Sequence, residues 1–197
     1  MPIWPICRKP APRGPSCCWG GADKALLPLA GQSLLSHVVA RLEPQVERLA
    51  ISANGDPARF RLGLPVLHDE TPLGPLSGVL AALRWAAPLG ATAVVTAAVD
   101  SPFLPGDLTP RLCMAAETAP EGLAIARSAK DHPTFGLWPV ALEPALAAFL
   151  ASGANPRVLA FTTAHHAARA AFPDETAFQN LNTPEDLSRA ETLLRSA

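Results

Sequence analysis

A single carboxylate, Asp100, follows the longest apolar run of the chain, "GATAVVTAAV" at 90–99. If that run is a buried strand that Pro102 ends, the carboxylate lies at the edge of a sheet. Hard cations such as Mg2+ prefer carboxylate oxygens and often bridge one protein aspartate to the phosphates of a substrate. The other interpretation is an aspartate that only begins the turn before Pro102, and the spacing alone does not decide between the two.

Lys24 follows Gly20 and Gly21 and precedes a leucine-rich segment. A lysine that a glycine-bearing loop delivers to a helix can neutralise phosphate charge during phosphoryl transfer. Taken in isolation, "GGADK" fits an exposed surface lysine better. The patterns GxxxxGK(S/T) and GxGxxG are absent from the sequence, so neither a Walker-type NTPase nor a dinucleotide-binding domain is indicated.

Two more polar residues, Asn54 and Asp69, each end a segment with a strand pattern. Either side chain could bond to a base or a ribose, and either could only shape its turn. The string "GPLSG" at 74–78 opens a helix with glycine on both sides, which permits a close approach of the backbone to a ligand. His132, which precedes a proline, is better explained as a packing residue than as a catalyst.

The elements that must position these residues alternate between strand and helix patterns. Strand patterns cover 49–53, 64–70, 92–102, 122–128, 132–140 and 165–172. Helix patterns cover 33–45, 74–88, 107–119, 142–153, a short stretch near 155 and 183–197. This alternation predicts an α/β fold with a mostly parallel central sheet and helices on both faces. Ligands of such sheets bind beyond the carboxyl ends of the strands, where Asn54, Asp69 and Asp100 would lie.

The composition excludes several other classes of protein. A chain of 197 residues is long enough to bury a core as one domain, and its net charge of −1 gives no reason to expect nucleic acid or a membrane surface as a partner. The four cysteines show no CxxC spacing, so a structural zinc site is not indicated. We find no signal-peptide pattern and no apolar run long enough to span a bilayer, and we expect a cytoplasmic protein.

Several segments, taken in order, resemble the molybdenum cofactor guanylyltransferase family of nucleotidyltransferases. They are "GGADKALLPLAGQSLLSHVVARL" at 20–42, "ISAN" at 51–54, "LHDETPLGPLSGVLAAL" at 67–83, "VDSPFLP" at 99–105, "KDHPTFGLW" at 130–138 and "NLNTPEDL" at 180–187. Each segment alone is weak, but their common order from Gly20 to the last helix is specific.

The resemblance implies a Rossmann-like nucleotidyltransferase fold for residues 20–197, as a single domain. It implies transfer of GMP from GTP to molybdopterin, with release of pyrophosphate. The residues implied to bind GTP are Gly20, Gly21, Lys24, Asn54, Asp69 and Asp100. Of these, Lys24 and Asp100 would be catalytic, with Lys24 on the GTP phosphates and Asp100 holding Mg2+. Transient contact with molybdoenzymes or their chaperones would belong to the same role.

Residues 1–19 depart from the family pattern, in which a buried strand runs into a loop of the form LAGGxSxRMG. This chain has "RKPAPRGPSCCW" at 8–19, and five prolines fall within its first fifteen residues. Proline lacks a backbone donor and is disfavoured in a central strand. We therefore expect residues 1–19 to be an aberrant or poorly ordered segment without the first strand of the sheet. The abrupt change near Trp19 suggests a reading-frame slip, as a hypothesis.

Two other functions fit the same residues. One is the transfer of CMP to molybdopterin, or of a nucleotide to a sugar phosphate, by a relative with the same fold; the strings "GPLSG", "DHPT" and "NLNTPEDL" favour guanine. The other is a catalytically impaired protein that binds molybdopterin but lacks the glycine-rich loop for GTP. The presence of Lys24, Asp69 and Asp100 argues against an inactive site.

Overall fold

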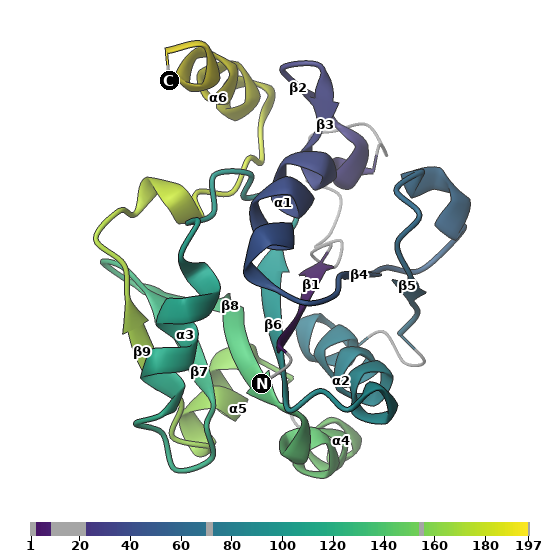
Figure 1. The fold of residues 1–197 in the computed structure, drawn as a ribbon, viewed down its shortest axis with the longest axis vertical. Helices are drawn as coiled ribbons and strands as arrows, with labels where there is room; N and C mark the ends of the chain where they lie inside the picture. Colours follow the sequence, from purple (N-terminus) through teal and green to yellow (C-terminus); the bar gives the residue numbers. More distant parts are fainter. Residues whose placement is uncertain (1–2, 9–22, 70–72, 154–155, 197) are drawn as a thin grey trace.

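The computed structural model describes residues 3–8, 23–69, 73–153 and 156–196, and of residues 3–8 it describes the backbone. At its centre is a seven-stranded sheet with the order β5-β4-β1-β6-β8-β7-β9 (Figure 1). The strands are β1 (Ile3–Arg8), β4 (Ala50–Ser52), β5 (Val66–Leu67), β6 (Ala93–Ala98), β7 (Ala124–Arg127), β8 (Asp131–Pro139) and β9 (Ala168–Ala171).

All strands of this sheet run in one direction except β8, which is antiparallel to both β6 and β7. A short turn joins β7 to β8, and in it the N–H of Ser128 donates to the carbonyl of Lys130 at 3.0 Å. Such a turn can only join antiparallel strands, because a parallel pair needs a crossover of about a dozen residues or more. The expected α/β fold with a mostly parallel sheet is confirmed, with one antiparallel strand inside the sheet.

Strand β1 lies inside the sheet, parallel to β4 on one side and to β6 on the other. We expected no strand in this proline-rich segment, and for residues 3–8 that expectation is wrong. The run "IWPIC" at 3–7 is apolar, which suits a strand between two helical layers. The N–H that Pro5 lacks removes one bond of the ladder, while the register along β6 continues from Ile3 to Arg8. The rest of the segment that we expected to be aberrant or poorly ordered, residues 1–2 and 9–19, lies outside the described residues.

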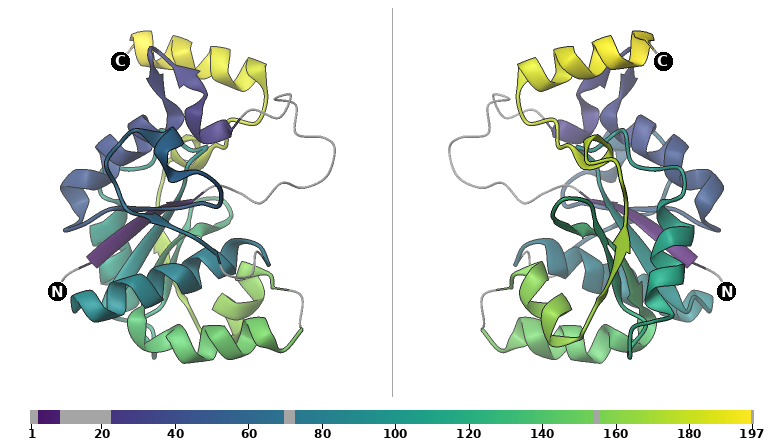
Figure 2. Two further views of the ribbon diagram at one scale, coloured as in Figure 1. Left: turned by 90° about the vertical axis from the view of Figure 1, so that its right-hand side faces the viewer. Right: turned by 90° about the vertical axis from the view of Figure 1, so that its left-hand side faces the viewer.

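Helices cover both faces of the sheet (Figure 2). On one face lie α1 (Leu34–Leu42) and α3 (Leu108–Ala116), and on the other lie α2 (Pro75–Ala86), α4 (Glu143–Ala151) and α5 (Val158–Ala164). Alternate residues of β6 serve the two layers: Val95 belongs to the core under α1 and α3, whereas Val94 packs with α2 and Trp138. This double burial explains why β6 carries no charged residue.

Beyond the carboxyl ends of the parallel strands lie α6 (Pro184–Ser196) and a hairpin of β2 (Pro28–Leu29) and β3 (Gln32–Ser33) (Figure 1). They share a small core of their own, made by Leu29, Leu34, Leu181 and Ala190. The chain therefore returns at its C-terminus to the side of the sheet on which the strand-end residues lie. No helix in the described part of the chain is long and apolar enough to cross a membrane.

Candidate active site

Asp100 lies two residues beyond the end of β6, and its side chain is only 2% exposed. Its backbone is held on two sides. The N–H of Ser101 donates to the carbonyl of Ala98 at 3.3 Å, and the carbonyl of Asp100 accepts a bond from the N–H of Leu181 at 2.8 Å. The strand-end carboxylate is thus fixed by its own turn and by the segment that leads into α6.

Lys24 opens a short 3-10 helix, η2 (Lys24–Leu26), which Asp23 caps by accepting the N–H of Ala25 at 3.1 Å. The Nζ atom of Lys24 lies 3.3 Å from Oδ2 of Asp100 and also donates to Oδ1 of Asn182. These two partners are 76 and 158 residues away in the sequence. The fold therefore gathers the lysine, the aspartate and an asparagine from three distant segments.

The carboxylate of Asp100 is only partly compensated. Burial raises the pKa of this carboxyl above its ordinary value, and the Lys24 ammonium opposes that rise without cancelling it. Among the described residues, Oδ1 of Asp100 has no hydrogen-bond partner. A buried oxygen without a partner is costly, and a divalent cation shared with a substrate would satisfy it. Within the same residues, no group of three or more His, Cys, Asp or Glu could hold a metal ion.

Asn54 and Asp69 come together at the ends of β4 and β5. The Oδ1 atom of Asn54 accepts the N–H of Asp69 at 2.9 Å, and Oδ1 of Asp69 lies 3.5 Å from the hydroxyl of Ser52. The first bond joins two neighbouring strand ends into one edge. Arg59 connects this edge to η2, because its guanidinium donates both to the carbonyl of Asn54 and to the carboxylate of Asp23.

The predicted residues therefore form two pairs on one rim of the sheet, Lys24 with Asp100 and Asn54 with Asp69. The two glycines predicted to bind phosphate, Gly20 and Gly21, lie outside the described residues.

Our sequence analysis missed four residues of this rim: Asp23, Arg59, Asn180 and Asn182. Asn180 accepts a bond from the hydroxyl of Ser101 at 2.8 Å, next to Asp100, and Asn182 accepts from Lys24. The available signal was the string "NLNTPEDL", in which two asparagines precede a helix start. Nothing in the local pattern shows that this helix start lies against Asp100.

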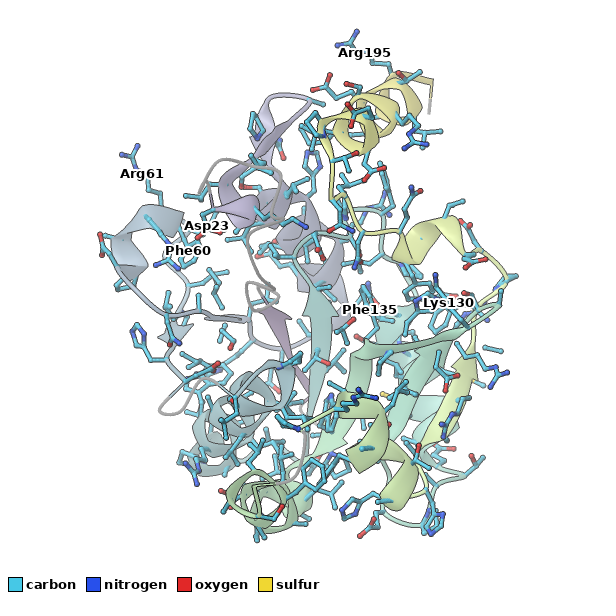
Figure 3. The ribbon with its side chains drawn as sticks, turned by 180° about the vertical axis from the view of Figure 1, so that it is seen from behind. Asp23, Phe60, Arg61, Lys130, Phe135 and Arg195 are labelled. Carbon is cyan, nitrogen blue, oxygen red and sulfur yellow. The ribbon has the colours of Figure 1, made fainter. Side chains whose placement is uncertain are left out.

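A cavity of about 610 Å³ opens beside Asn182. Residues 130–135 line one side of it, and residues 175–176, 178–180 and 182 line the other; Figure 3 labels Lys130 and Phe135 of the first side. His132 lies in this wall and is 7% exposed. A second cavity of about 580 Å³ lies between β5, α2 and α4 and shares no lining residue with the predicted site.

His132 is held by packing, in line with our interpretation. Its ring stacks on Phe178 with a centroid distance of 4.4 Å, and its Nε2 lies 2.7 Å from the hydroxyl of Ser128. Burial lowers the pKa of His132 below its ordinary value, and Lys130 lowers it further. The ring therefore tends to stay neutral and to brace the wall of the cavity.

The family described as MobA-like NTP transferase domain matches residues 14–169. A relative from Cereibacter sphaeroides, named molybdenum cofactor guanylyltransferase, is 64% identical over 178 residues, which are 89% of this chain and 90% of that protein.

The chain belongs to the MobA-like NTP transferase family. The resemblance of the ordered motifs is thereby confirmed, and so is the assignment to an enzyme family of nucleotidyltransferases.

Solved structures share the fold. Molybdopterin-guanine dinucleotide biosynthesis protein A from Archaeoglobus fulgidus superposes with a TM-score of 0.71 at 20% identity, over 100% of each chain. A 2-C-methyl-D-erythritol 4-phosphate cytidylyltransferase from Thermus thermophilus gives 0.66 at 19% identity, over 99% of this chain and 98% of the other. The nucleotidyltransferase fold is therefore confirmed. Proteins named for guanine and for cytidine nucleotides both have this fold.

Proposed function

We propose that this chain transfers GMP from GTP to molybdopterin and releases pyrophosphate. The observation that carries the proposal is the contact of Lys24 with the buried Asp100 at the strand ends of a chain that is 64% identical to a named guanylyltransferase. The substrates would be GTP and molybdopterin, and we place the reaction in the cytoplasm. The predicted transient contact with molybdoenzymes or their chaperones stays a prediction.

The reaction needs no nucleophile from the protein. An oxygen of the molybdopterin phosphate attacks the α-phosphorus of GTP, and the bond from that phosphorus to the bridging oxygen of pyrophosphate breaks. Two anionic groups must meet in line, so the main tasks of the protein are to position them and to offset their repulsion. Lys24 supplies a fixed positive charge, and its bonds to Asp100 and Asn182 hold the ammonium in place.

Asp100 fits a magnesium site. Its unpartnered Oδ1 is a carboxylate oxygen, the ligand that Mg2+ prefers, and one protein carboxylate with substrate phosphates is a common magnesium environment. When bound, Mg2+ would neutralise phosphate charge and orient the leaving pyrophosphate.

The two substrates would bind on opposite sides of the Lys24–Asp100 pair. Asn54 and Asp69 lie on the β4–β5 side and would hold the nucleoside, and Lys24 with the predicted residues Gly20 and Gly21 would bind the phosphates. The 610 Å³ cavity lies on the other side and has Asn180 and Asn182 in its wall. Its size is that of a small-molecule site, and it would take the molybdopterin.

The second candidate is transfer of CMP to molybdopterin or of a nucleotide to a sugar phosphate. It is favoured only by the shared fold of the cytidylyltransferase structure. The base would be selected near Asn54, Asp69 and the glycine loop. The observations on the Lys24–Asp100 pair apply equally to both nucleotides.

The test is a direct assay with purified chain, molybdopterin, Mg2+ and either GTP or CTP, in which the dinucleotide product and pyrophosphate are measured. The Cereibacter sphaeroides relative serves as the positive control, and a variant with an LAGG-type loop before Gly20 is assayed in parallel. Product from GTP supports the proposal, and product from CTP alone supports the alternative. Product only from the variant would show that the family reaction is correct and that the native segment limits it. No product from either chain, while the relative is active, would overturn the proposal.

A further inference from the structure

Arg59 links the two halves of the candidate site. Its Nε donates to Oδ2 of Asp23 at 3.0 Å, Nη1 donates to the carbonyl of Asp56 at 2.6 Å, and Nη2 donates to the carbonyl of Asn54 at 2.7 Å. Asp23 directly precedes Lys24, and Asn54 lies two residues after the end of β4. One guanidinium therefore holds the turn that presents the lysine and the loop that presents the asparagine.

The local structure prepares Arg59 for this task. It lies on a 3-10 helix, η4 (Pro57–Phe60), whose first turn Asp56 caps by accepting the N–H of Ala58 at 2.9 Å. The guanidinium carbon lies 4.2 Å from the centroid of the Phe60 ring. Gly55 has a φ of +90°, and a Cβ at that position would lie 3.1 Å from Nη1. The backbone thus bends closely under the guanidinium, where a larger residue would press on it.

Asp23 receives Arg59 on one oxygen and caps η2 with the other. Its Oδ2 takes the bond from Arg59, and its Oδ1 accepts the N–H of Ala25. The side chains of Arg59 and Asp23 are 21% and 13% exposed, so the ion pair is largely shielded from water. A shielded, charge-assisted pair with further hydrogen bonds is stronger than an exposed one, which is usually worth little.

We propose that Arg59 is a positioning residue of the nucleotidyl transfer, which sets the place of Lys24 relative to Asn54 by clamping Asp23. This role rests on the proposed function, since it assumes that the phosphates and the nucleoside of one nucleotide lie on these two residues. Asp23 and Arg59 are 36 residues apart in sequence, so no local constraint sets their distance. A lysine at position 59 would keep the charge but could not reach three acceptors in a planar fork.

The test compares Arg59→Lys, Asp23→Asn and the double variant with the control Arg61→Lys. Arg61 is its near neighbour, is exposed and points away from the body of the molecule in Figure 3, where Asp23 and Phe60 are also labelled. Two measurements are made on each folded variant: steady-state kinetics with GTP and molybdopterin varied separately, and hydrogen exchange by mass spectrometry of peptides covering 23–27 and 54–60.

We expect Arg59→Lys to lower kcat/KM for GTP by about tenfold or more, because misplacement of a positioning contact by a fraction of an ångström is costly. The KM for molybdopterin should stay unchanged. Asp23→Asn keeps an oxygen that can cap Ala25 but loses its charge, so it should act in the same direction. Since both changes break one interaction, the double variant should lose no more than the worse single variant. Exchange should rise at 23–27 as well as at 54–60.

Two results would overturn the proposal. One is wild-type kinetics for Arg59→Lys, matching Arg61→Lys. The other is faster exchange confined to 54–60, which would make Arg59 an anchor of its own loop only. If neither the wild-type chain nor the LAGG-loop variant forms dinucleotide while the relative is active, the proposed function fails, but the exchange measurement at 23–27 still decides whether Arg59 positions the Lys24 turn.

Discussion

At the scale of single residues, the site keeps a carboxylate in a place that disfavours its charge. Asp100 is 2% exposed, and the Nζ of Lys24 lies 3.3 Å from its Oδ2. Oδ2 faces the lysine, while Oδ1 has no hydrogen-bond partner among the described residues. An oxygen left in this way costs stability in the free protein, and the same property suits it to bind a cation that arrives with a nucleotide.

Asp100→Asn should therefore raise the thermal stability of the free protein and lower its activity. The pKa of Asp100 is raised in the folded state. The wild type therefore has the full stability of its protonated carboxyl below the unfolded-state pKa, and it loses that stability as the pH rises through the folded-state pKa. Without nucleotide and cation, we expect the variant to match the wild type at acid pH and to exceed its Tm by roughly 2–4 °C at neutral pH, the effect of about 1 kcal/mol in such a domain. Turnover should fall on the order of a hundredfold or more.

Thermal unfolding across pH and steady-state assays measure both effects. A neutral-pH Tm below that of the wild type would contradict the prediction, since it would mean that Lys24 fully compensates the buried charge.

Lys24→Met should show the opposite effect on stability. It removes the ammonium that lies 3.3 Å from the Asp100 carboxylate, and the loss of one partner of a shielded pair costs on the order of 2 kcal/mol at neutral pH. The double variant Lys24→Met/Asp100→Asn should regain most of that loss, because no uncompensated charge remains. Chemical unfolding of the wild type and three variants gives the coupling, and a double variant as unstable as Lys24→Met would contradict it.

At the scale of elements, the start of α6 controls how Asn180 and Asn182 reach the site. The hydroxyl of Thr183 accepts the N–H of Asp186 at 3.2 Å, and the carboxylate of Asp186 accepts the N–H groups of Asn182 and Thr183, each at 3.0 Å. This reciprocal arrangement is a capping box with aspartate in the acidic position. It fixes the direction in which the chain passes the Lys24 ammonium.

Thr183→Ala should lower the free energy of unfolding by about 1 kcal/mol through loss of the cap. The pKa of Asp186 is lowered, first by the backbone N–H of Asn182, so its stabilising effect is present above the unfolded-state pKa and is lost as the pH falls through the folded-state pKa. The difference between variant and wild type should accordingly shrink in acid. Ser188→Ala, on an exposed position of the same helix, is the control and should change stability little. An equal loss in both variants would rule out the cap as the cause.

At the scale of the whole molecule, β8 pairs with both β6 and β7, and its side chains reach the cores on both faces of the sheet. The side chains and backbone are tightly packed where β8 lies between these two strands. The hydroxyl of Thr96 accepts the indole N–H of Trp138 at 3.0 Å and lies within hydrogen-bond distance of both backbone groups of Gly136. A Cβ on Gly136 would lie 3.0 Å from the carbonyl oxygen of Ala124 and 3.0 Å from Nε1 of Trp138. A side chain at position 136 would therefore require its neighbours to shift by a few tenths of an ångström.

Gly136→Ala should therefore destabilise the protein by about 1–3 kcal/mol, the usual cost of overpacking a core. Gly106→Ala is the matched control, because no atom lies within 4 Å of a Cβ placed there. We expect a clear fall in Tm for the first and little change for the second, with kcat/KM at low temperature kept in both. A normal Tm for Gly136→Ala would show that the sheet can move apart at this point without cost.

The parts of this fold that the sequence predicts are those that local patterns encode. Leu34, Leu35, Val38 and Leu42 follow the helical period and are buried in α1, and Ser33 caps that helix with a 3.1 Å bond to the N–H of Ser36. The position of Asp100 just beyond a buried strand also follows from its apolar run, whereas its contact with Lys24, 76 residues away, is set by the fold. The strand β1 does not follow from the sequence, because the prolines of residues 1–19 point away from a strand while pairing with β4 and β6 supports one.

The sequence by itself determined the α/β class, the helices and strands, and the polar residues at strand ends. The reason is that an element buried on one face or on two has a characteristic spacing of apolar residues in the sequence. What only the tertiary structure decided is which distant segments meet. The 158 residues between Lys24 and Asn182, and the 36 between Asp23 and Arg59, carry no local pattern that sets those distances. Those contacts depend on the order of strands in the sheet and on the return of α6 to the rim, so the residues that position the lysine emerge only from the folded chain.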